Sequence, residues 1–204
     1  LPEALLNYLA RLGHNYAETA LLDQTALAGA FDLAHIGHSP AHFDHQQLEH
    51  WQGEAVRHAD SDRLWQWLAE SESALSTQVP AAQRAEFVAT VRGNLTRPRE
   101  SLHWARVLNG EAEPDQDAMA VLRQTDAGFF RHALDCLPGA NGAFSDYARA
   151  VATASGRKGK ALYMPLRAAL TGRLHGPEME RLWKLLPAAS VERQLRRAAE
   201  LAVN

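Results

Sequence analysis

The sequence predicts an all-α protein, a stack of short helices joined by short connections. Apolar residues recur at helical spacing in almost every segment. The clearest case is LPEALLNYLARLG, where the helical spacing places several leucines on one predicted apolar stripe: Leu5, Leu6, Leu9 and Leu12. Glycine and proline breakers separate the segments, and the alternation of apolar and polar residues that is typical of strands is brief throughout. No sheet is expected.

Capping residues and breakers place the helix ends. Pro2 opens the first helix and Gly13 ends it. Asp44, with Gln47 three residues later, predicts a capping box at the start of a long second helix. Further helical patterns follow in order at 60–70, 80–92, 98–108, 117–124, 126–137 and 144–154. Breakers at 93–94, 110–114 and 138–142 suggest boundaries near residues 60, 110 and 140. We divide the chain into units 1–59, 60–110 and 111–204.

Composition excludes several classes of protein. The chain has 204 residues, a formal net charge of -3 and one cysteine, Cys136, so neither an internal disulfide nor a cysteine-based zinc site is available. No apolar run reaches the roughly 18 residues of a membrane helix, and the first residues do not resemble a secretion signal. We therefore expect a cytoplasmic protein without a membrane partner, and we expect Cys136 to be a core residue.

Charge is distributed unevenly along the chain. Residues 156–204 hold 10 Lys and Arg against 4 Asp and Glu, whereas residues 1–155 hold 11 against 20. A basic end on an acidic body is suited to holding a polyanion at one face, although solvated helices with no partner would show the same pattern. The basic side chains begin in the stretch GRKGKALYMPLRAALTGR: Arg157, Lys158, Lys160, Arg167 and Arg173.

That stretch resembles the C-terminal anticodon-binding region of bacterial glutamyl-tRNA synthetases, class I aminoacyl-tRNA synthetases. Its similar elements are Lys158-Gly159-Lys160, Pro165-Leu166-Arg167, Ala169-Leu170-Thr171-Gly172 and His175-Gly176-Pro177. Residues 1–13 resemble the helix after the family's catalytic lysine loop, and FDLAHIGHSPAHFD at 31–44 is similar to another family segment. All three matches follow the family's order, while residues 60–140 are only weakly similar.

The resemblance implies a C-terminal half without the catalytic domain. Residues 1–59 would end the stem-contact domain, and the other two units would be anticodon-binding subdomains. The letters His35-Ile36-Gly37-His38 spell one ATP signature of the family, but no strand precedes them, and the second signature would lie before Leu1. We therefore expect this chain to hold no cofactor, because ATP and Mg would bind the parent enzyme's catalytic domain, and to be inactive alone in attaching glutamate to tRNA.

Candidate tRNA contacts lie in two regions. In the basic stretch, Gly156 and Gly159 would let the backbone approach a phosphate whose charge Arg157, Lys158 and Lys160 neutralise. The planar fork of Arg167 can grip a base edge, and the resemblance implies that it surrounds the first and middle anticodon bases together with the turn from Leu174 through Gly176 and Pro177 to Met179. Alternatively, Pro165 starts a core helix and Arg167 pairs with an acid.

A second region, residues 91–108, matches the family segment that reads the third anticodon base. Some members have an arginine there that helps reject glutamine tRNA, and this chain has Asn94 at that position with Arg92 and Arg97 nearby. The expected partner is therefore glutamate tRNA, with glutamine tRNA as a second candidate. The alternative for this region is a surface turn with solvated arginines.

Four histidines have the spacing of one helical face: His35, His38, His42 and His45. Ser39-Pro40 would interrupt such a helix, so a metal site is not expected. With the resemblance, we expect a monomeric, tRNA-binding part of a glutamate–tRNA ligase. The alternatives are a non-enzymatic all-α protein-interaction module or a helix-turn-helix DNA binder with a basic C-terminal face.

Overall fold

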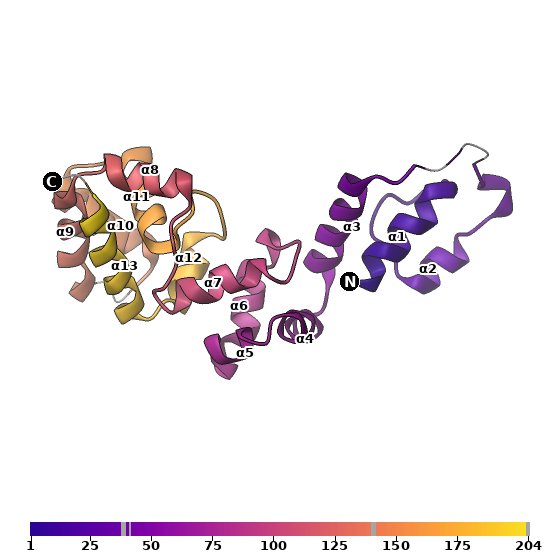
Figure 1. The fold of residues 1–204 in the computed structure, drawn as a ribbon, viewed down its shortest axis with the longest axis horizontal. Coiled ribbons are helices and arrows are strands. Elements are labelled where there is room, and N and C mark those ends of the chain that lie inside the picture. The colour runs from indigo at the N-terminus through magenta and orange to yellow at the C-terminus, as the bar shows by residue number, and fades with distance from the viewer. Residues whose placement is uncertain (38–39, 41, 140–141, 203–204) are drawn as a thin grey trace.

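A computed structural model describes residues 1–37, 40, 42–139 and 142–202 of the chain. Within these residues thirteen α-helices and four short 3-10 helices follow one another along an elongated molecule (Figure 1). The one pairing of extended segments in the described part is a single bridge between His14 and Ile36. The all-α prediction is confirmed.

The first part of the chain packs on a small core of its own. It contains α1 (Pro2–Gly13), α2 (Gln24–Gly29), η1 (Leu33–His35) and α3 (His45–His58). Asp44 caps α3 as predicted, accepting from the backbone N–H groups of Gln46 and Gln47. The other half of the expected capping box does not form, because the N–H of Asp44 donates to the Tyr8 hydroxyl at 2.7 Å. The buried apolar residues of this core are Ala4, Tyr8, Trp51 and Ala55.

The predicted leucine stripe of α1 is largely not the buried one. Ala4 and Tyr8 are 1% exposed, whereas Leu5 and Leu9 are 49% and 51% exposed and Leu6 is also exposed. The face that packs is chosen by tertiary contacts: α3 receives the Ala4–Tyr8 face, and Asn7 is buried where it bonds the backbone carbonyl of Leu22 at 2.7 Å. Helical period alone indicates a stripe but does not say which neighbour covers it.

A larger core runs through the rest of the molecule. Its first helices are α4 (Ser61–Ser71), α5 (Leu75–Gln78), η2 (Ala81–Gln83), α6 (Arg84–Val91), η3 (Arg92–Asn94) and α7 (Glu100–Leu108). The others are α8 (Gln116–Gln124), α9 (Ala127–Asp135), η4 (Leu137–Gly139), α10 (Phe144–Ser155), α11 (Lys160–Thr171), α12 (Met179–Leu185) and α13 (Ala188–Leu201). One contiguous cluster of buried side chains extends from Val56 to Ala198, and Cys136 packs against its edge. The proposed division at residue 110 stays a prediction.

Helix α11 carries most of the basic stretch. It begins at Lys160 after Gly159, whose φ of +54° turns the chain into the helix, and it ends at Gly172, whose φ is +64°. Pro165 lies inside α11 and is buried, so the alternative in which a helix starts at Pro165 is wrong. A Cβ at Gly172 would lie 2.5 Å from the Glu113 carbonyl oxygen, which explains why the chain has glycine there.

None of the helices in the described ranges is both long and apolar enough to cross a lipid bilayer.

Candidate nucleic-acid interface

The turn between α11 and α12, residues 172–178, is fixed from two sides. On one side both terminal nitrogens of Arg167 donate to the carbonyl oxygen of Pro177, each at 3.1 Å. On the other side Gly176 lies against Trp104 of α7, so closely that an added Cβ would be 2.3 Å from the indole ring. Arg167 is half-buried, and this burial lowers the pKa of its guanidinium from the ordinary value. The turn is thereby held in one conformation.

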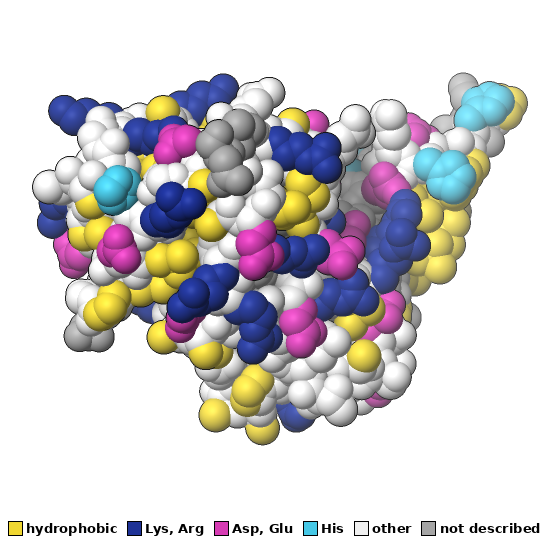
Figure 2. Space-filling model, turned by 60° about the vertical axis from the view of Figure 1, so that its left-hand side comes forward, with side chains coloured by type: hydrophobic (Ala, Val, Ile, Leu, Met, Phe, Trp, Pro, Cys, Tyr) yellow, Lys and Arg dark blue, Asp and Glu magenta, His cyan; other side chains and the backbone are white. Residues whose placement is uncertain are grey.

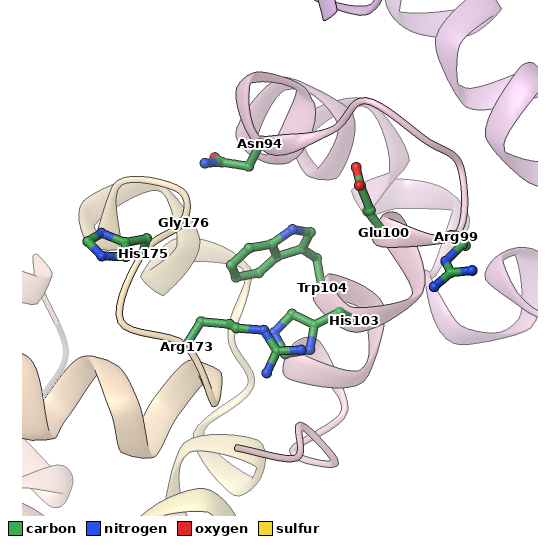
Figure 3. Close-up of a pocket in the computed structure, with 8 residues that line it drawn as sticks. All are labelled: Asn94, Arg99, Glu100, His103, Trp104, Arg173, His175 and Gly176. Atoms are coloured by element: carbon green, nitrogen blue, oxygen red, sulfur yellow. The ribbon is translucent and has the colours of Figure 1, made fainter. Parts of the chain in front are cut away.

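A hollow of about 380 Å³ opens on the Trp104 side of this turn. Figure 3 shows the indole of Trp104 below Asn94, which comes from η3, and beside the chain at Gly176. Asn94 and His175 are exposed. The two regions that the sequence singled out separately therefore meet at one place. The lining residues are Asn94, Arg99, Glu100, His103, Trp104, Arg173, His175 and Gly176.

His103 lies neutral beneath this hollow. Burial, followed by the positive charge of Arg173, lowers the pKa of its imidazole to about 4. Its Nε2 atom is buried and makes no hydrogen bond among the described residues. Arg173 donates to the carbonyl oxygens of Gly172 at 2.9 Å and Glu113 at 3.3 Å, and it forms an ion pair with Asp115 at 3.5 Å. At neutral pH the wall of the hollow thus combines a fixed cation with an uncharged imidazole.

A second hollow, of about 470 Å³, opens on the Arg167 side of the turn. Met179 is buried at its wall, while Leu174 packs half-buried against the large core. The carboxylate of Glu180 accepts from the backbone N–H groups of Phe144 at 3.0 Å and Ser145 at 2.7 Å. Its pKa is lowered from the ordinary value, mainly by the side chain of Ser145 and further by these backbone bonds. The lining residues are Phe144, Ser145, Tyr163, Arg167, Glu178, Met179 and Glu180.

The three cations before and at the start of α11 differ in their surroundings. Arg157 is half-buried, forms an ion pair with Asp126, and lies 4.8 Å from the ring centroid of Phe129. Lys158 and Lys160 are exposed, and neither forms an ion pair with any residue that the structure describes. Lys158 and Lys160 are therefore available to an external phosphate, whereas Arg157 is engaged within the fold.

Arg92 and Arg97 do not line either hollow. Arg92 donates to the Arg57 carbonyl oxygen at 3.2 Å and to the Ser61 hydroxyl at 2.9 Å, so it ties η3 to the junction of α3 and α4. Arg97 forms an ion pair with Glu49 of α3. The arginines that line the hollow with Asn94 are Arg99 and Arg173 instead.

The four histidines that were considered as metal ligands are only partly within the described residues, because His38 lies outside them. His35 pairs with Asp32 at 3.3 Å, and His45 starts α3 with its ring against Phe43. In the ranges that the structure describes, no group of three or more His, Cys, Asp or Glu side chains could hold a metal ion.

Lys and Arg side chains form several groups on the face shown in Figure 2, with Asp and Glu side chains between them. The excess of positive charge in residues 156–204 is therefore not an unbroken basic surface on this face. Binding there would depend on individual cations and on the two hollows more than on a general positive potential.

Sequence reasoning missed His103 and Trp104 as wall residues. Both lie in a segment whose apolar period marks them only as helical, and the contact of Trp104 with Gly176 joins positions far apart in the sequence. A weak signal was present: Gly176 precedes Pro177, and a glycine with a φ of +154° is needed where the chain passes a large ring.

Comparisons with known proteins give matches over most of the chain. The model of the family described as "Anticodon binding domain" matches residues 62–199. Glutamate–tRNA ligase 2 of Nitrosococcus oceani is 44% identical over 201 residues, which are 98% of this chain and 42% of that protein. Glutamate–tRNA ligase 2 of Acidithiobacillus ferrooxidans is 44% identical over 197 residues, 97% of this chain and 40% of that protein.

A solved glutamate tRNA ligase from Elizabethkingia meningosepticum has the same fold, with a TM-score of 0.80 over 98% of this chain and 41% of that chain at 16% identity. The chain thus spans well under half the length of these relatives. Because the family model covers most of the chain, from α4 to α13, the protein belongs to the anticodon binding domain family.

Proposed function

We propose that this chain is the anticodon-binding part of a glutamate–tRNA ligase and that it binds the anticodon loop of glutamate tRNA. The observation that carries the proposal is the turn at residues 172–178, which has one hollow lined by Asn94 on one side and a second hollow lined by Arg167 on the other. Two sequence regions assigned to different anticodon bases therefore border the same turn. Relatives named as glutamate–tRNA ligases support the choice of partner.

The chemistry of an anticodon suits these hollows. Its bases are single-stranded and unstacked, so they can be splayed out and recognised on their edges. Arg167 has five N–H donors, and the two bonds to Pro177 leave others for a base edge. Lys158 and Lys160 supply phosphate neutralisation close to the N-terminus of α11. The acidic balance of residues 1–155 disfavours binding of the same polyanion over the rest of the surface.

Titration of the chain with glutamate tRNA at several salt concentrations tests this division of roles. Arg167→Ala is expected to cost about 1–3 kcal/mol and to reduce the preference for the correct anticodon. Lys158→Ala and Lys160→Ala are expected to weaken all tRNAs alike and to lower the salt slope by about one unit each. Arg196→Ala is the matched control, because that side chain pairs with Glu192 on α13. Equal losses of affinity for correct and altered anticodons in Arg167→Ala would refute the base-recognition role.

A further question is whether the site also accepts glutamine tRNA. The anticodon of glutamate tRNA ends in C and that of glutamine tRNA ends in G. Asn94 offers one donor and one acceptor group on a short neutral side chain, where an arginine would fill the space and offer donors alone. We expect the site to accept both bases. A preference of tenfold or more for C, about 1.4 kcal/mol, would contradict this expectation. If Asn94→Arg changes neither affinity, the assignment of Asn94 to the third base is wrong.

The proposal places glutamate activation, with its ATP and Mg, in another part of a longer cytoplasmic enzyme. The isolated chain is therefore expected to be a monomer that catalyses no glutamate-dependent pyrophosphate exchange, and a measurable exchange rate would contradict this. Salt-dependent binding of tRNA in preference to duplex DNA is expected. Equal or stronger binding of duplex DNA would favour a DNA-binding module, and no nucleic-acid binding would favour a protein-interaction module.

A further inference from the structure

Tyr163 is an exposed aromatic residue in the large-core part of the molecule. It is 49% exposed, while the exposed Phe31, Leu33 and Phe43 all belong to the first part of the chain. Its side chain lines the second hollow together with Arg167, which follows it by four residues on α11. Residues four apart on a helix are neighbours on the same face. The phenol ring and the guanidinium are therefore presented to the same space.

Lys160 extends this face toward the start of α11. Offsets of three and seven residues from Lys160 bring Tyr163 and Arg167 within about 60° of it around the helix axis. At 1.5 Å of rise per residue the three positions span about 10 Å along the axis. In this order the face offers an exposed ammonium, an aromatic ring and a half-buried guanidinium.

The surroundings of Tyr163 favour a base over a phosphate in this hollow. Phe144 is buried and its ring centroid lies 6.4 Å from that of Tyr163, so the phenol ring is backed by the core. Glu178 and Glu180 both line the hollow, and the bonds that Glu180 accepts keep its carboxylate ionised. Glu178 pairs with Arg181 at 4.0 Å, so the charges around the hollow are close to balanced and leave no excess of positive charge to hold a phosphate there. A neutral base with a flat face and a polar edge needs no such excess.

We propose that Tyr163 is the stacking platform for one unstacked base of the anticodon. The base lies with its face on the phenol ring and its edge toward Arg167, and the phosphate of the same nucleotide lies toward Lys160. Stacking on an aromatic ring tolerates any base, so Tyr163 supplies affinity while Arg167 supplies selectivity. This inference rests on the proposed tRNA-binding function and adds to it a residue and a mode of contact.

The test compares Tyr163→Ala and Tyr163→Phe with wild type in titrations of four glutamate tRNAs. One is intact, and each of the others carries an abasic nucleotide at one anticodon position. Tyr163→Ala is expected to weaken the intact tRNA by roughly 5- to 150-fold, which corresponds to about 1–3 kcal/mol of stacking. Tyr163→Phe keeps the ring and is expected to keep the affinity. Arg196→Ala is again the control, because that side chain pairs with Glu192 on α13 and lies outside both hollows.

The abasic tRNAs locate the contact. At one anticodon position, removal of the base is expected to make wild type and Tyr163→Ala bind equally, because the partner of the ring is then absent. The proposal is overturned if Tyr163→Ala binds the intact tRNA as wild type does, if its loss persists on all three abasic tRNAs, or if Tyr163→Phe loses as much as Tyr163→Ala. A failure of the proposed anticodon binding itself is recognised separately, because wild type would then bind the intact and abasic tRNAs equally. That result would also overturn the stacking role of Tyr163.

Discussion

Replacing Gly176 with alanine is the substitution that perturbs the turn at residues 172–178 most directly. Gly176 has a φ of +154°, a conformation that side chains other than glycine rarely adopt. An added Cβ would lie 2.3 Å from Cη2, 2.9 Å from Cζ2 and 3.3 Å from Cζ3 of Trp104. Trp104 is 5% exposed and belongs to the large core, so its ring has little room to move away.

Two costs combine in Gly176→Ala. Holding alanine in a rarely adopted backbone conformation costs about 1–3 kcal/mol, and forcing a methyl group into a packed core costs about 1–3 kcal/mol. We therefore expect the free energy of unfolding to fall by about 2–6 kcal/mol, with Tm lowered by about 2–4 °C for each of these kcal/mol. The carbonyl that Arg167 holds belongs to the next residue, so tRNA affinity is expected to fall as well.

Urea denaturation followed by circular dichroism measures this loss, and two other glycines serve as controls. Gly156 has a φ of +70° with nothing near its Cβ position, so Gly156→Ala isolates the backbone cost of about 1–2 kcal/mol. Gly93 has open space and no positive φ, so Gly93→Ala is expected to leave stability unchanged or raised by about 0.4–1 kcal/mol. If Gly176→Ala is no less stable than Gly156→Ala, the contact with Trp104 does not constrain the turn.

Three further predictions concern the surroundings of the turn. Because folding lowers the pKa of His103 from 6.5 to about 4, the unfolded chain binds more protons between these values, so stability is retained above pH 6.5 and falls as pH drops toward 4. This loss of unfolding free energy amounts to at most about 3 kcal/mol. In His103→Gln the loss between pH 6.5 and 4 should be absent, and a pH profile of stability that is the same as that of wild type would contradict the prediction. Arg92→Ala should lower the unfolding free energy by about 1–3 kcal/mol with tRNA affinity unchanged, and an affinity loss at unchanged stability would reverse this assignment. Glu49→Gln should cost less than about 1 kcal/mol, because its ion pair with Arg97 is exposed; a larger loss in urea denaturation would show that the pair holds α3 against the chain at Arg97.

Local signals in the sequence predicted much of the fold. Pro2, Gly13 and Asp44 mark helix ends through chemistry that acts over a few residues, and the structure has ends at or beside all three. The Tyr8 hydroxyl that bonds the N–H of Asp44 comes from another helix, so the local capping-box pattern could not reveal it. The exposed leucines of α1 show the same limit, because packing between helices decides which stripe is buried.

The candidate site was predictable as a set of residues and less so as an arrangement. Charge and spacing singled out Arg157, but its pairing with Asp126 arises only when the start of α9 packs beside the loop before α11. Arg92 and Asn94 are two residues apart in η3, yet the Arg92 side chain bonds the Ser61 hydroxyl whereas Asn94 lines the first hollow. The sequence identifies such cations, but the residues that pair with them come from distant parts of the chain and are known only from the structure.

Transplanting the glutamate anticodon into an unrelated tRNA tests the central claim most directly. The affinity of the chain for that tRNA is measured before and after the three bases are exchanged, at one fixed salt concentration, with wild type and Arg167→Ala. The account predicts that wild type gains about tenfold or more on the exchange, about 1.4 kcal/mol, and that most of this gain disappears in Arg167→Ala. Unchanged affinity of wild type for the two tRNAs would contradict recognition of the anticodon by this chain.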